Sequence, residues 1–323
     1  MSNLVVATLE PTNALSTDLV SLKVDAQAYA ANARATNTTK AYQGDIARFR
    51  AWCDSQGLPT LPATPASVAL YITHLANQGR TMATISRALV AISELHRAAG
   101  EPSPCRHDGV RTVRQGIART IGRAPKKKTA FPLDALRAFA RSCPETLTGL
   151  RDRALVLIGF AGAFRRSELV GLDVADVAFC SFGATVILRR SKTDQEGLGV
   201  AVGIPTGQDP TCCPVQALRA WLEASSQVDG PLFRGVDRNG HVRAGRLCDR
   251  TVAHIVKAAC VATGLDPTTY AGHSLRSGFA TAAIQAGKTE TSTMRQTRHK
   301  SVPIFRGYVR AATVFQDNAA SFL

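Results

Sequence analysis

One break in the hydrophobic periodicity divides this chain into two parts. Between Gly122 and Phe131 the sequence reads RAPKKKTA, where a proline and three successive lysines interrupt every apolar repeat. A chain of 323 residues is also longer than a single hydrophobic core usually serves. We therefore expect four parts: a loosely held arm over 1–23, a helical domain over 24–122, a basic linker over 123–130 and a second domain over 131–323.

The first domain is expected to be all helical. Four of its segments carry apolar side chains at helical spacing. They begin near Thr38, Thr64, Met82 and Pro104 and end near Gly57, Gly79, Ala99 and Ile121. We expect four or five short helices in this part of the chain.

The second domain mixes helices with one small antiparallel sheet. The runs ATVIL (184–188) and VAVGI (200–204) are typical of two strands joined by the loop RRSKTDQEGLG. Helices are expected over 133–142, 148–163, 214–225, 249–263 and 274–286, with a short one opened by Pro303 and a terminal one over 314–323. The fold class is therefore mainly α with a small sheet.

The charge of the chain favours a polyanionic partner. Lysine and arginine number 39 against 24 acidic residues, which gives a net charge of +15 and is most often associated with nucleic acid. The densest segment, 106–128, holds eight basic residues opposed only by Asp108. The candidate DNA-binding residues are Arg111, Arg114, Arg119, Arg123, Lys126, Lys127 and Lys128. The alternative is a solvated helix face followed by a flexible linker.

Several classes of protein are disfavoured. The eight cysteines are scattered without a Cys-x-x-Cys pair, so neither a zinc site nor a disulfide framework is indicated. The N-terminus lacks the features of a signal peptide, and no stretch approaches 18 uninterrupted apolar residues. We expect a soluble protein of the cytoplasm.

Residues suited to phosphate chemistry are dispersed through the second domain. His273 and Arg276 are three apart, so on a helix they share a face and can bind one ligand together. Arg165 supplies a second guanidinium, whose planar fork fits a phosphate. Tyr308 adds a phenol, which can act as a nucleophile once it is deprotonated.

These residues resemble the motifs of the tyrosine recombinase (phage integrase) family, of the Cre and Xer kind. The family pattern R-x-[ST/A]-E-[LI] is matched by Arg165 to Leu169, and H-x-L-R by His273 to Arg276. The third box is usually Leu-Gly-His with the nucleophilic tyrosine nine residues on. Here His299 and Tyr308 keep that spacing, but Thr-Arg replaces Leu-Gly.

The resemblance implies a role for each residue. The expected catalytic set is Arg165, Lys192, His273, Arg276, His299 and Tyr308. Glu168 is expected to orient one of the arginines or histidines without contacting the substrate itself. Lys192 matches the lysine that the family carries on a β-hairpin, as a general acid, and His273 is the expected base. No acidic cluster with metal-binding spacing accompanies them, so no cofactor is expected.

The resemblance also implies a fold, a substrate and an assembly. A SAM-like helical core-binding domain and an α+β catalytic domain would act on double-stranded DNA with paired inverted-repeat sites, through a 3′-phosphotyrosine and a Holliday junction. A tetramer would form through the terminal helix 314–323, although docking of this helix on its own domain is an equal alternative. Two other functions stay open: topoisomerase IB-like cleavage without strand exchange, and a non-catalytic DNA-binding regulator.

Overall fold

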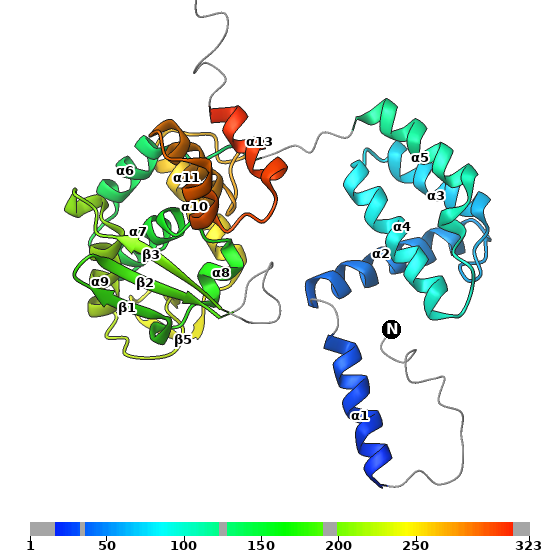
Figure 1. Ribbon diagram of the computed structural model, residues 1–323, viewed down its shortest axis with the longest axis horizontal. Helices are drawn as coiled ribbons and strands as arrows, with labels where there is room; N and C mark the ends of the chain where they lie inside the picture. Colours follow the sequence, from blue (N-terminus) through cyan, green and yellow to red (C-terminus); the bar gives the residue numbers. More distant parts are fainter. Residues whose placement is uncertain (1–16, 33–35, 123–127, 190–198, 313–323) are drawn as a thin grey trace, which may run out of the picture. The chain divides into compact units, whose positions relative to one another are not determined.

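The computed structural model describes residues 17–32, 36–122, 128–189 and 199–312 (Figure 1). The chain divides into two compact units, Met1–Lys126 and Lys127–Leu323. This division falls inside the segment 123–130, of which 128–130 is described. Most of the arm and all of the expected terminal helix lie outside the described residues, and the expected domain boundaries stay predictions.

Among its described residues the first unit holds helices and no strand, as expected. They are α1 (Thr17–Asn32), α2 (Thr36–Ser55), α3 (Pro65–Asn77), α4 (Met82–Ala98) and α5 (Asp108–Ile121). The hydroxyls of Thr64 and Thr81 accept hydrogen bonds from the amides of Ser67 and Thr84, which caps the first turns of α3 and α4.

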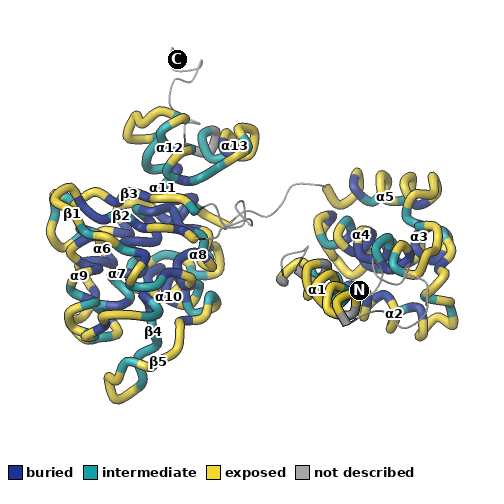
Figure 2. Tube along the Cα trace, turned by 60° about the horizontal axis from the view of Figure 1, so that its bottom comes forward, coloured by how far each residue is buried: buried dark blue, intermediate teal, exposed yellow. Residues whose placement is uncertain are grey.

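Two details of the expected helices are wrong. The helix expected from Pro104 is divided: a 3-10 turn ends before His107, whose ring Nδ1 accepts a hydrogen bond from the amide of Gly109 at 3.1 Å and caps α5. Residues 17–23, expected in the arm, belong to α1. This helix is largely exposed (Figure 2), and its apolar side chains include the exposed Leu22 and Tyr29. It therefore lacks the apolar stripe by which a helix that packs on a core is recognised in a sequence.

The core of the first unit lies among α2, α3 and α4. Phe49, Tyr71, Ile72 and Ile85 are almost completely buried in it. His96 is also fully buried and accepts a hydrogen bond from the amide of Ala63 at 2.9 Å, so it is a core residue.

The second unit combines helices with two small sheets. Its helices are α6 (Leu133–Ser142), α7 (Leu147–Ala161), α8 (Arg166–Gly171), α9 (Pro214–Ala224), α10 (Asp249–Ala262), α11 (Ser274–Gln285), α12 (Glu290–Thr297) and α13 (Val302–Ala312). Its strands are β1 (Val177–Cys180), β2 (Gly183–Leu188), β3 (Val200–Pro205), β4 (Arg234–Val236) and β5 (Val242–Arg246). The fold is mainly helical with antiparallel strands, which confirms the expected class.

The expected hairpin is present, but the expectation of a single sheet is wrong. Strands β2 and β3 pair antiparallel, with Leu188 opposite Val200, and β1 extends them to the order β1-β2-β3. Strands β4 and β5 form a second, two-stranded sheet. Both are short and glycine-containing and lack a buried, alternating face, so period-2 patterning does not reveal them. Helix α12 was also not expected, because ETSTMRQT has no apolar repeat.

Helix α7 is the centre of the second unit. It contacts α9, α10 and α11, and every residue from Ala154 to Phe160 is buried (Figure 2). Gly159 allows α8 and α11 to approach closely, because a Cβ there would lie 3.0 Å from the side chains of Leu169 and Leu275. This packing fixes α8, which Arg165 immediately precedes, and α11, which carries Arg276.

Two further features bear on the sequence expectations. All eight cysteines are described and none forms a disulfide. Within the described ranges, no helix has the length and apolar character needed to cross a membrane.

Candidate active site

A strained turn after α7 precedes the first arginine of the site. Ala163 is buried and adopts a left-handed backbone with φ of 46°, a conformation that costs an L-residue roughly 1–2 kcal/mol. Its carbonyl accepts hydrogen bonds from Arg276 Nη1 at 2.7 Å and from Arg298 Nη2 at 3.0 Å. Two cationic side chains therefore stabilise the turn that leads into Arg165.

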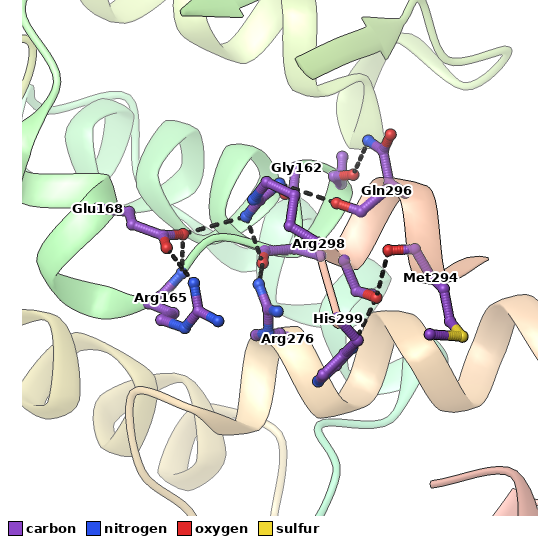
Figure 3. A network of polar contacts seen from close by, with 11 residues as sticks. Gly162, Arg165, Glu168, Arg276, Met294, Gln296, Arg298 and His299 are labelled. Carbon is purple, nitrogen blue, oxygen red and sulfur yellow. Dashed lines mark hydrogen bonds and ion pairs between the residues drawn. The ribbon is translucent and has the colours of Figure 1, made fainter. Parts of the chain in front are cut away.

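Glu168 holds Arg165 in place from the first turn of α8. Its carboxylate accepts a hydrogen bond from the backbone amide of Arg165 at 2.9 Å and forms an ion pair with the Arg165 guanidinium (Figure 3). The oxygen that accepts from the Arg165 amide, Oε2, also pairs with Arg298 Nη2 at 3.1 Å. Burial favours a higher pKa for Glu168, but the Arg165 amide and the charges of Arg298 and Arg165 outweigh it and lower the pKa. The carboxylate is ionised at neutral pH.

Arg276 presents donors that no described group accepts. Its side chain is 1% exposed, and Nη1 is bound to the carbonyl of Ala163. Its Nε and Nη2 are buried without a hydrogen-bond partner among the described residues. Burial, followed by the charges of Arg165 and Arg298, lowers the pKa of Arg276 to about 9, so it still carries its charge at neutral pH. Two buried, unpaired N–H donors on a cation are expected where an anion binds.

His299 is presented by a tight reversal after α12. The helix ends at Thr297, and Arg298 takes the left-handed conformation with φ of 55° and ψ of 42°. The Thr297 hydroxyl donates to the carbonyl of Thr293 at 2.8 Å and lies 2.7 Å from His299 Nδ1. Because that hydroxyl has one proton, the histidine Nδ1 is the donor in their contact, which leaves Nε2 as the acceptor in the neutral ring.

Burial and positive neighbours keep His299 neutral. Burial, then the charges of Arg276 and Arg165, lowers the pKa of His299 to about 4. The ring packs against Phe305 and Tyr308, with centroids 5.7 and 5.4 Å away. This packing fixes His299 beside the phenol.

The phenol of Tyr308 meets an imidazole from another helix. Its oxygen on α13 lies 3.0 Å from Nε2 of His273, the residue that precedes α11. Burial raises the pKa of Tyr308, while the charges of Arg276 and Arg165 act to lower it. The hydroxyl therefore carries its proton at neutral pH and has a base within hydrogen-bonding distance.

The structure brings six of the expected site residues into one region of the second unit: Arg165, Glu168, His273, Arg276, His299 and Tyr308. Lys192 lies outside the described residues, between β2 and β3 in the chain. Tyr270, a second tyrosine three residues before His273, is buried with its ring 5.9 Å from that of Phe131, so it is a packing residue.

The structure describes four of the candidate DNA-binding residues. Arg111, Arg114 and Arg119 are on α5 of the first unit, where Arg111 pairs with Asp108 at 2.7 Å. Lys128 is exposed, and its Nζ donates to the carbonyl of Thr268 at 2.6 Å. Arg123, Lys126 and Lys127 lie outside the described residues.

Sequence reasoning missed two residues of the site, Thr297 and Arg298. They replace the Leu-Gly of the third motif, and the structure shows that both contact expected members. The signal was an arginine at a position where the family has glycine. No group of three His, Cys, Asp or Glu side chains that could hold a metal occurs in the part of the chain that the structure describes.

Comparisons with known proteins show the family of the chain. Residues 130–313 match the Phage integrase family, and residues 28–101 match the Phage integrase, N-terminal SAM-like domain. An integrase/recombinase xerD homolog of Selenomonas ruminantium is 40% identical over 290 residues, covering 88% of this chain and 85% of the relative.

Two solved structures have the same fold. The XerH site-specific recombinase bound to its palindromic difH substrate is 18% identical with a TM-score of 0.62, covering 97% of this chain and 87% of that one. A lambda integrase tetramer bound to a Holliday junction is 16% identical with a TM-score of 0.58, covering 94% and 80%.

Proposed function

This chain belongs to the phage integrase family, and we propose that Tyr308 is the nucleophile with which it cleaves and rejoins DNA. The protein is a site-specific tyrosine recombinase, and the relatives described above lend no support to a topoisomerase or a non-catalytic regulator. The observation that carries the assignment is the Tyr308 oxygen 3.0 Å from His273, in a region with unpaired donors on buried Arg276.

The arginines are proposed to bind the scissile phosphate. A phosphodiester is anionic and repels nucleophiles, so its charge must be neutralised before attack. The free Nε and Nη2 of Arg276 and the partly exposed guanidinium of Arg165 are suited to its non-bridging oxygens. His299 completes this group: in the free protein Nε2 has no proton, and the nearby phosphate charge would favour its protonation and hence a further hydrogen bond.

The proposed reaction conserves the energy of the bond that it breaks. His273 Nε2 takes the phenolic proton while the Tyr308 oxygen attacks phosphorus, and the bond from phosphorus to the 5′-oxygen breaks. Lys192 gives a proton to the departing oxygen. The products are a 3′-phosphotyrosine and a 5′-hydroxyl, and the 5′-hydroxyl of a partner strand reverses the step on the new duplex to form a Holliday junction.

The substrate and assembly are proposed on the same basis. The first domain would bind one half of a DNA site with paired inverted repeats, with the basic residues of α5 and the following linker on the phosphates. A tetramer would align four such active sites, and the lambda integrase tetramer on a Holliday junction supports this arrangement. Residues 314–323 are the proposed coupling element and lie outside the described residues. Since the substrate is DNA, we place the protein in the cytoplasm.

Adduct mapping tests this proposal. A nicked substrate loses the short strand carrying the 5′-hydroxyl after cleavage, so the protein is trapped on DNA. Digestion and mass spectrometry are expected to place the nucleotide on Tyr308, with its 3′-phosphate attached. Attachment of the protein to a 5′-phosphate would contradict the proposal. Cleavage of the native DNA site without any covalent adduct would also contradict it.

A further inference from the structure

The third motif of this chain contains an arginine that the family pattern does not use. We infer that Arg298 is a positioning residue that locks Arg165, Glu168 and the preceding turn into the geometry needed for cleavage. This inference rests on the proposed function, because the geometry it explains is that of the phosphate site. The usual glycine cannot make any of these side-chain contacts.

The contacts of Arg298 converge on one structural element. Its Nη1 donates to the carbonyl of Gly162 at 2.9 Å, and its Nη2 to the carbonyl of Ala163 at 3.0 Å and to Glu168 at 3.1 Å (Figure 3). Nη1 also donates to the carbonyl of Gln296 at 2.8 Å. One guanidinium thereby joins the end of α12 to the turn after α7 and to the first turn of α8.

Burial makes these contacts strong and specific. The Arg298 side chain is 7% exposed and that of Glu168 is 2% exposed. The guanidinium carbon also lies over the Phe164 ring, 5.1 Å from its centre. A lysine has a single point charge and cannot reach several acceptors with the planar fork that this site uses.

The backbone is strained on both sides of this contact. Ala163 and Arg298 both have positive φ, 46° and 55°. An L-residue in such a conformation persists only when its surroundings hold it there. Arg298 binds the Ala163 carbonyl directly, so the two strained positions are fixed by one side chain, and Arg165 and His299 follow them in the chain.

Arg298 also changes the charge that Arg165 and Arg276 present. Glu168 is a carboxylate shared by Arg165 and Arg298. With Arg276, three guanidiniums and one carboxylate leave a net charge of 3 − 1 = +2 at the site. Without Arg298, Glu168 would neutralise Arg165 more completely, and the site would hold the phosphate less strongly as charge develops on it.

Replacement of Arg298 by glycine tests the inference. Glycine tolerates φ of 55° and restores the family residue, but it removes every side-chain contact. We expect single-turnover cleavage at saturating DNA to fall roughly 10–100-fold, the scale of a small misplacement of reacting groups. The Kd for DNA should change far less, because the first domain and the linker still bind. R295A, at an exposed arginine in the last turn of α12 and three residues before Arg298, is the matched control.

Two further arms separate positioning from loss of folding. R298K keeps size and charge, so it should fold like wild type and still cleave at least about tenfold slower. Added guanidinium ion, far below unfolding concentrations, should restore cleavage to R298G, while sodium chloride of equal ionic strength should not. In an E168Q background, R298G should cause a smaller loss than in wild type, because the shared carboxylate is already gone.

Other outcomes overturn the inference. R298G or R298K cleaving as fast as wild type would do so, as would a loss of rate explained fully by weaker DNA binding. Failure of the proposed function is distinguishable, because it would appear in wild-type protein as an adduct that does not map to Tyr308, whatever residue stands at position 298.

Discussion

Nε2 of His273 lies 3.0 Å from the phenol oxygen of Tyr308. The two residues are 35 positions apart, one just before α11 and the other on α13. Contact between these helices brings them together. Burial raises the pKa of Tyr308, so the phenol keeps its proton at neutral pH. A base beside it can remove that proton during the attack on phosphorus.

The first prediction follows from this contact. Replacement of His273 by alanine should slow cleavage by roughly 10²–10⁴-fold at pH 7, the usual contribution of a general base. Raising the pH should recover part of the loss, because hydroxide then supplies the phenolate. Single-turnover cleavage from pH 7 to 10 measures this, with H254A, at an exposed histidine, as the control. An equal loss of cleavage rate at every pH would contradict the assignment of His273 as the base.

The second prediction concerns stability and pH. The pKa of His299 is lowered to about 4, first by burial and then by the charges of Arg276 and Arg165, whereas an unfolded histidine has a pKa of about 6.5. The unfolded chain therefore binds more protons between these values, and the stabilising contribution is complete above pH 6.5 and lost as the pH falls toward 4. Thermal unfolding of H299Q should depend less on pH in this window than that of wild type; identical pH dependence would refute the prediction.

The third prediction tests Lys192 as general acid. K192A should lose roughly 10²–10⁴-fold in cleavage of ordinary DNA. A substrate with sulfur in place of the departing 5′-oxygen needs no proton, since a thiolate is a good leaving group, and K192A should cleave it almost as fast as wild type. R276A should not be rescued, because its loss concerns the phosphate itself. Equal defects on both substrates would remove Lys192 from this role.

The fourth prediction concerns the basic face of α5. Each phosphate contact contributes about 0.9 to the slope of log affinity against log salt concentration. Simultaneous replacement of Arg111, Arg114 and Arg119 by alanine should therefore reduce that slope by up to about 2.7, somewhat less because Arg111 already pairs with Asp108. Fluorescence anisotropy across a salt series measures it. An unchanged slope would show that this face is solvated and not bound to DNA.

The parts of the fold that are predictable from sequence are those with a local signal. Helices α3 and α4 begin at capping threonines, and β2 and β3 are short apolar runs, so each is recognisable without tertiary information. Helix α12 has a capping threonine, Thr289, but no apolar repeat, and β4 and β5 have no alternating buried face, so the sequence pattern does not reveal them.

The contacts of the site also differ in whether a local sequence signal predicts them. Arg165 and Glu168 interact three residues apart, so their motif describes a real local contact. The approach of His273 to Tyr308 depends on helix packing, and only the resemblance to a family indicated it. Arg298 was missed because its motif position normally holds glycine, and nothing local shows that its side chain reaches back to Ala163.

Replacement of Tyr308 by phenylalanine is the most direct test of the central claim. The change removes one oxygen and leaves the ring packed against His299, so folding and DNA binding should be kept. On a nicked substrate the wild-type protein should form a covalent adduct that resists denaturant, and Y308F should form none and leave the DNA uncut. An adduct formed by Y308F, on Tyr270 or any other residue, would contradict the account.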